Sequence, residues 1–273
     1  MIRALIVILV ATYAIHLSPT EACAHFLFAH VVRGVDPRVE LHFAESAWDF
    51  SSSERMITLM SPATSVDGSG RPLEFTAEPY ALVTPLPAGE AVACAAFTYG
   101  LMTRGEPFLL EYHAKGVAGL DAAAQPSDLR AEVVARRRGT DQLDLTVLFD
   151  GTPVPDAEVV VPGPARTSRT MTTDTEGTII IDRPATPLFS IRAMVPETRS
   201  GVHQDKPYER VRHYTTLTVH AADEIPSTSD GLAWALFHDT MPHADAGDTP
   251  NWTGTFRAST DGVVGQGTLR SDG

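Results

Sequence analysis

Cysteine is scarce in this chain of 273 residues, which contains only Cys23 and Cys94. Two cysteines cannot build the framework of several disulfides that supports many small secreted domains. Long apolar runs are scarce too. After the first 24 residues, no run approaches the roughly 20 apolar residues that a membrane-spanning helix needs. We therefore expect no membrane span after the N-terminal segment, and a fold that depends on an ordinary hydrophobic core.

Basic residues are outnumbered, with 21 Lys and Arg against 34 Asp and Glu and a formal net charge of -13. No basic stripe is available to neutralise phosphates, so nucleic acid is excluded as an expected partner. Catalytic signatures are also missing. The sequence has no Gly-x-Ser-x-Gly elbow, no dinucleotide-binding glycine motif and no phosphate-binding loop of the Walker type. We predict that the protein is not an enzyme.

The N-terminus has the three parts of a secretory signal peptide. Arg3 precedes an apolar run over residues 4–15, and a small-x-small triplet ends at Ala24. Cleavage after Ala24 would remove residues 1–24 and place the protein in the periplasm or outside the cell. The alternative is a lipoprotein acylated at Cys23, which Glu21 disfavours because a small residue normally stands there.

Short strand-like segments dominate the rest of the chain, separated by turns rich in Gly, Pro and Asp. This pattern predicts an all-β protein with two β-sandwich domains, Ig-like or transthyretin-like, after the cleaved signal peptide. The predicted strands are 25–32, 38–43, 55–59, 64–66, 73–77, 80–85, 91–99, 108–114, 143–149, 157–161, 169–173, 178–181, 188–194 and 213–220.

Composition divides the chain after the signal peptide. We expect an N-terminal sandwich over residues 25–115 and a transthyretin-like sandwich over residues 141–222. Residues 116–140, rich in Ala, Asp, Pro and Arg, are predicted to be a linker that contains at most one short helix. Residues 223–273 form a tail with a short helix near 230–238 and a hairpin, and they resemble the opening of a truncated third domain.

Three histidines are the candidate metal ligands, namely His25, His42 and His113. Removal of the leader would leave His25 first in the chain, where its α-amine and ring nitrogen together can chelate a borderline metal ion. Strand ends that are distant in sequence can meet in an antiparallel sandwich. We therefore expect these three residues to form one site for Ni, Co, Cu or Zn. The alternative is that His42 and His113 are ordinary outward-facing side chains beside Glu40 and Glu111.

A second polar group lies near the end of the transthyretin-like domain. It contains His203, Tyr208, Arg212 and His213. Two interpretations remain open. The group is either a second site, in which His203 joins His213, or a domain interface in which Arg212 pairs with an acidic group of the first domain.

Three stretches together resemble a known family. They read AHFLF after the leader, FTYGLMTRGEPFLLEYHAKG over residues 97–116, and YERVRHYTTLTV over residues 208–219. In this order and spacing they resemble bacterial secreted proteins of the nickel-uptake-type family of unknown function, over roughly residues 24–220. Two further stretches, VLFDGTPVPDAEVVV and TTDTEGTIII, resemble the transthyretin-like or carboxypeptidase-regulatory module, which usually serves structure or docking.

These observations predict a secreted or periplasmic metal-binding protein. The family resemblance implies nickel or cobalt uptake or handling, with a membrane transporter or another envelope protein as the partner. The alternative function is a non-catalytic structural or protein-binding β-sandwich protein that holds no metal. A copper monooxygenase with a histidine brace is the third possibility, but it would need exposed aromatic residues on a flat face, and the aromatic residues of this sequence are predicted to be buried.

Overall fold

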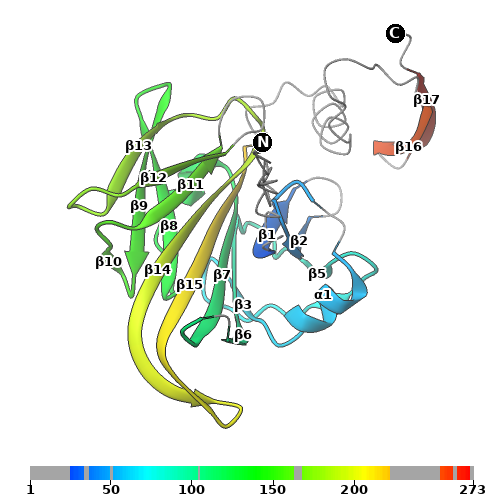
Figure 1. Ribbon diagram of the computed structural model, residues 1–273. Coiled ribbons are helices and arrows are strands. Elements are labelled where there is room, and N and C mark those ends of the chain that lie inside the picture. Colours follow the sequence, from blue (N-terminus) through cyan, green and yellow to red (C-terminus); the bar gives the residue numbers. More distant parts are fainter. Residues whose placement is uncertain are drawn as a thin grey trace, which may run out of the picture.

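The computed structural model describes residues 25–33, 37–49, 52–103, 105–162 and 168–221, and the backbone of two strands at 253–260 and 263–270. Figure 1 shows their arrangement. The predicted signal peptide over residues 1–24 and the helix predicted near 230–238 lie outside these residues. Within the described part, no helix has both the length and the apolar character required to cross a membrane.

Strands make up most of the described structure, so the all-β prediction is confirmed. The Ig-like or transthyretin-like identity of its layers stays a prediction. The elements are β1 (Phe26–Val32), β2 (Arg38–Ala44), α1 (Glu54–Met60), β3 (Thr64–Asp67), β4 (Thr76–Ala77), β5 (Leu82–Pro85), β6 (Val92–Met102), β7 (Phe108–Ala118), α2 (Leu120–Ala123), β8 (Ala131–Arg138), β9 (Gln142–Phe149), β10 (Thr152–Pro153), β11 (Glu158–Pro162), β12 (Ser168–Thr172), β13 (Thr178–Asp182), β14 (Leu188–His203), β15 (Lys206–His220), β16 (Thr253–Thr260) and β17 (Val263–Arg270).

The strands of residues 25–221 form three sheets. The central sheet has seven strands in the order β12-β11-β14-β15-β7-β6-β3. The N-terminal sheet has the order β1-β2-β5-β4, and the β8–β9 sheet contains β10, β9, β13 and β8. Neighbouring strands are antiparallel except for β7 and β15, which pair in parallel. That pairing joins strands of the two predicted domains in one sheet.

The central sheet lies between the other two sheets (Figure 1). Alternate residues of β15 point to opposite faces, as in any strand. Leu217 and Val219 pack with Leu145 of the β8–β9 sheet in one core. On the other face, the hydroxyl of Thr216 donates a hydrogen bond to the carbonyl oxygen of Leu27 on β1, over 2.7 Å. Polar residues on the two faces of β15 are therefore covered by two different layers. The β8–β9 sheet covers one face, and the N-terminal sheet covers the other.

Gly116 on β7 allows the N-terminal sheet to approach closely. A Cβ atom at this position would collide with the backbone carbonyl of Ala29 on β1. Ala29 itself is completely buried. The missing side chain of Gly116 thus sets the distance between β1 and the central sheet.

Two local predictions need correction. Residues 55–59, predicted as a strand, belong to α1, because Ser53 is extended at the N-cap and Ile57 and Met60, three residues apart, are buried on one side. Residues 116–140, predicted as a linker, contain the end of β7, α2 and β8. Alternate residues of β8, such as Val133, enter the core, and Arg138 pairs with Asp144 on β9 at 3.1 Å.

Candidate metal centre

The three predicted ligands lie in three different places. The His25 ring stacks on Phe43, with centroids 5.9 Å apart. His42 precedes Phe43 on β2 and therefore points to the opposite face of that strand. His113 is on β7 in the central sheet. Among the described residues, the only group of three metal-binding side chains whose ligand atoms converge does not contain His25 or His42. This corrects the prediction of a single site built from all three.

The group that does converge consists of Glu111, His113 and His213, whose ligand atoms lie within 4.8 Å of one another. With Glu197, which contacts His213, it is named here the carboxylate-rich cluster. His113 Nε2 and His213 Nδ1 are 3.1 Å apart, and the same Nδ1 lies 3.4 Å from Oε2 of Glu111. His213 thus faces one imidazole and one carboxylate with the same ring nitrogen.

Strand register creates this cluster. Glu111 and His113 are two residues apart on β7 and therefore share a face. In the parallel pairing, His213 on β15 stands opposite Glu111, which puts its ring diagonally next to His113. Glu197 lies on the far side of β15, on the paired strand β14. All of these side chains point towards the β8–β9 sheet. There the ring centroid of Phe149 lies 4.9 Å from the ring centroid of His213.

The bond to Glu197 decides which nitrogen of His213 has a lone pair. His213 Nε2 lies 2.9 Å from Oε2 of Glu197. An ionised carboxylate only accepts hydrogen bonds, so Nε2 must donate and Nδ1 of the neutral ring keeps its lone pair. That lone pair faces the oxygen of Glu111 and the nitrogen of His113. A proton or a metal ion between these atoms is needed to avoid repulsion.

Both imidazoles of this cluster are held in the neutral form. His113 is 4% exposed and His213 is completely buried. Burial is the main cause that lowers the pKa of His113 to about 3, and the repulsion that a protonated ring would meet from His213 and Arg130 adds to it. Burial also lowers the pKa of His213, against the opposing effect of Glu197. Neutral imidazoles have the lone pairs that a metal requires.

Two arginines balance the carboxylates. Arg199 lies 2.7 Å from Glu111 and 3.0 Å from Glu197, and Arg130 bridges Glu197 and Asp150. Burial alone would raise the pKa of Glu197, but hydrogen bonds from His213 and Arg130 outweigh it and lower that pKa. Three carboxylates against two guanidinium groups leave one net negative charge beside the imidazoles. The side chains of Glu111 and Glu197 are 15% and 17% exposed, so an ion has a route from solvent.

His113 differs from His213 at its second ring nitrogen. Its second ring nitrogen, Nδ1, is buried and has no hydrogen-bond partner among the described residues. An unpaired buried polar group costs about 1–3 kcal/mol. An ion held between His113 Nε2 and His213 Nδ1 would not reach this nitrogen, so His113 lacks the outer partner that Glu197 provides for His213.

A second group of imidazoles lies on the opposite face of β15. It consists of the histidines His30, His42 and His220 together with Glu40, and is named here the three-histidine cluster. His30 Nδ1 lies 3.0 Å from His220 Nε2, and His42 Nε2 lies 3.1 Å from Oε2 of Glu40. The rings of His42 and His220 are each 5.3 Å from that of His30, measured between centroids. His42 was thus predicted as a ligand, but its neighbours were not.

The second predicted polar group does not hold together. His213 belongs to the carboxylate-rich cluster, whereas His203 lies near the far end of the β14–β15 hairpin. Arg212 points to the other face of β15, and its guanidinium lies 4.1 Å above the ring of Phe108. The interface partner of Arg212 is therefore an aromatic ring of the first predicted domain in place of the predicted acid. Tyr208, at the same hairpin end, packs on Gly201.

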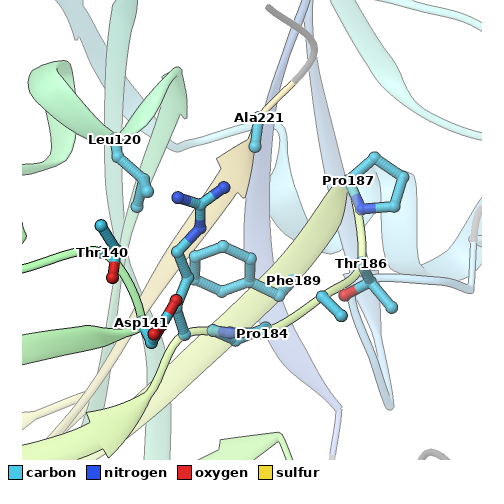
Figure 2. A pocket seen from close by; sticks show the side chains of 10 residues that line it. Leu120, Thr140, Asp141, Pro184, Thr186, Pro187, Phe189 and Ala221 are labelled. Atoms are coloured by element: carbon cyan, nitrogen blue, oxygen red, sulfur yellow. The ribbon is translucent and has the colours of Figure 1, made fainter. Parts of the chain in front are cut away.

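A cavity of about 410 Å³ is lined by residues that belong to neither cluster (Figure 2). Leu120, Phe189 and Ala221 are among its walls, together with Thr140, Asp141 and several residues of the 183–187 loop. Among the described residues that line it, none is a histidine and Asp141 is the single carboxylate. The cavity therefore lacks the donor set of a metal site.

Comparisons with models of known protein families and with curated protein sequences returned no match. The resemblance to the nickel-uptake-type family stays a prediction.

Proposed function

We propose that this protein binds a transition metal ion, nickel or cobalt by its family resemblance, at the carboxylate-rich cluster. Glu111, His113 and His213 would be the ligands. The observation that supports this function is the meeting of a His213 lone pair with a carboxylate and an imidazole. Its two contacts of 3.1 and 3.4 Å match the spacing of ligands on one ion. Bonds of about 2.0–2.1 Å place neighbouring ligands about 3.0–3.4 Å apart in octahedral or tetrahedral geometry.

Glu197, which contacts the outer ring nitrogen of His213, supports the same interpretation. A metal-bound histidine usually donates its other ring N–H to a carboxylate, which fixes the tautomer and increases the basicity of the ligand. Glu197 has this relation to His213. Two nitrogens and one oxygen suit Zn²⁺, Ni²⁺, Co²⁺ or Cu²⁺ better than they suit the oxygen-preferring Mg²⁺ or Ca²⁺.

The proposal also includes export of the protein from the cytoplasm. A chain cleaved after Ala24 would meet metal ions in the periplasm or outside the cell, where a membrane transporter or another envelope protein would be the partner that receives the ion. His25, whose ring stacks on Phe43, is not a ligand of this cluster. Its α-amine would form a separate chelate after cleavage.

Isothermal titration of the purified chain with Ni²⁺, Co²⁺, Zn²⁺ and Cu²⁺ tests the site. We expect one ion per chain at the cluster, and His113→Gln should weaken its binding by at least 100-fold. Glu106→Gln is the matched control for Glu111→Gln, because Glu106 is also paired with an arginine, Arg210, at 3.0 Å. The control should bind as the wild type does, whereas Glu111→Gln should not.

The opposite result has a definite meaning. If His113→Gln leaves the affinity and the stoichiometry unchanged for all four ions, the cluster is not a metal site. The structural or protein-binding function would then be preferred, with the cluster serving as a hydrogen-bonded network between layers.

A further inference from the structure

We propose that Arg199 acts as an internal cation of the carboxylate-rich cluster, which competes with the metal ion for Glu111 and so limits the affinity of the site. The inference rests on the proposed function and concerns the regulation of that same site. Arg199 is not a ligand in this account. It holds one oxygen of a ligand, and the ion has to compete with it.

The first argument is the contact between Arg199 and Glu111. Arg199 Nη2 donates a hydrogen bond to Oε1 of Glu111 over 2.7 Å. The other carboxylate oxygen, Oε2, lies 3.4 Å from Nδ1 of His213. One oxygen of Glu111 therefore faces the imidazoles, while the guanidinium holds the other. Hydrogen bonds between ionised groups are short and strong, so an ion that draws on both oxygens has to displace Arg199.

The second argument is that Arg199 also contacts Glu197. Its Nε lies 3.0 Å from Oε2 of Glu197, the same oxygen that accepts the hydrogen bond from His213 Nε2. Burial alone would lower the pKa of Arg199, but the hydrogen bond to Glu111 and the charges of both carboxylates outweigh it and raise that pKa. The guanidinium is therefore charged whenever an ion reaches the cluster.

The third argument is the backbone around Arg199. The pairing register of β14 against β15 shifts by one residue between Thr198 and Gly201, so Arg199 lies in a β-bulge. Bulges are common beside functional sites, where they change the direction of a side chain. The side chain of Arg199 is 37% exposed, against 15% for Glu111. A displaced guanidinium can therefore turn into solvent.

The fourth argument is the charge of the cluster. Three carboxylates and two guanidinium groups leave one net negative charge. Without Arg199, two negative charges would remain, which equals the charge of a divalent ion in magnitude. A positive charge near a dication opposes its binding. Arg199 thus keeps the affinity below the value that these ligands could reach, which suits a protein that passes its ion to a partner.

The test compares the wild type with Arg199→Gln by titration with Ni²⁺ and Zn²⁺. The glutamine amide can still donate a hydrogen bond to Glu111 but has no charge. We expect Arg199→Gln to bind the ion more tightly by about 10-fold or more, because a repelling charge is removed. Arg199→Lys keeps the charge and should stay within about 3-fold of the wild type. Arg210→Gln is the matched control, because it removes another arginine of the same hairpin, one paired with Glu106, and should leave the affinity unchanged.

The direction of the effect separates this proposal from a structural role. Replacement of a merely structural residue would weaken binding or leave it unchanged, so either result in Arg199→Gln overturns the proposal. Equal tightening in Arg199→Lys would also overturn it, since charge would not be the cause. If neither the wild type nor Arg199→Gln binds an ion, the proposed function itself is refuted, and this inference with it.

A measurement on the wild type covers the case in which Arg199→Gln does not fold. Zn²⁺ has a filled d shell and no redox chemistry, so the side-chain Nε–H signal of Arg199 can be followed by NMR as Zn²⁺ is added. The signal should shift in proportion to the bound ion as the guanidinium leaves Glu111. Binding of Zn²⁺ with an unchanged Arg199 signal would overturn the proposal.

Discussion

The two clusters lie on opposite faces of the same strand and place imidazoles in different surroundings. In the carboxylate-rich cluster, three carboxylates and two arginines surround His113 and His213, and the acidic side opens to solvent. In the three-histidine cluster, one carboxylate already paired with Arg38 accompanies three imidazoles. The comparison teaches that a similar contact between two histidines can stand in different surroundings, because among the described residues only the carboxylate-rich cluster brings three ligand atoms together.

The face of the carboxylate-rich cluster also has a buried ion pair, and breaking it should have the largest effect. Lys115 and Glu132 are 3.1 Å apart, and their side chains are 0% and 1% exposed. Lys115→Met leaves the Glu132 charge buried without its partner, so we expect a loss of about 3–5 kcal/mol in the free energy of unfolding. Urea denaturation measures it. The double variant with Glu132→Gln should be more stable than Lys115→Met, and a double variant that is less stable would contradict this account.

Acid should destabilise the protein through buried histidines on both faces of the central sheet. The pKa of His113 is lowered to about 3 and that of His220 to about 4, in both cases mainly by burial. In the unfolded chain both titrate near 6.5. Below pH 6.5 the unfolded chain therefore binds protons that the folded protein does not bind. The free energy of unfolding falls as the pH falls towards the pKa values of these histidines in the folded protein.

Between pH 7.5 and 5.5 we expect each of these histidines to remove about 1.4 kcal/mol from the stability of the metal-free protein, or about 3 kcal/mol together. Denaturation at both pH values gives the difference. His220→Gln should reduce the pH dependence by about half of this amount. An unchanged pH dependence in that variant would show that His220 is protonated equally in both states.

Gly116→Ala should separate the two faces. The added methyl group would collide with the carbonyl of Ala29, and overpacking of this kind costs about 1–3 kcal/mol. The damage should fall on the β1 side, whereas the carboxylate-rich cluster on the other face should keep its ion. Gly139→Ala is the control, because its Cβ would meet open space and only its φ of +67° is unfavourable. Loss of the ion from the carboxylate-rich cluster in Gly116→Ala would refute this separation.

Glu197→Gln should have the smallest effect, and only on the carboxylate-rich cluster. Loss of a carboxylate behind a metal-bound histidine typically reduces affinity by about 10- to 100-fold. We expect a reduction in that range for Ni²⁺ or Zn²⁺ by titration. A variant that binds the dication as tightly as the wild type would show that Glu197 does not support a ligand.

The sequence by itself predicted most of the strands and their faces, although it missed β8, which lies in the segment predicted as a linker. Alternation predicted β2 and β9, and it places Glu111 and His113 on one side of β7 whatever the partner strand is. A short segment such as α1 was harder, because seven residues with apolar side chains fit a strand or a helix. The histidines were recognisable as candidates, but their grouping was not.

Only the tertiary structure decided which histidines meet. The parallel pairing of β7 with β15 joins residues about a hundred positions apart and sets His213 opposite Glu111. Similarly, the close approach of β1 to Gly116 places His30, on β1, in contact with His220 on β15. Strand periodicity states which way a side chain points, but the choice of neighbouring strand and its register depends on packing of the whole core. For this reason the three predicted ligands were separated and new partners were found for two of them.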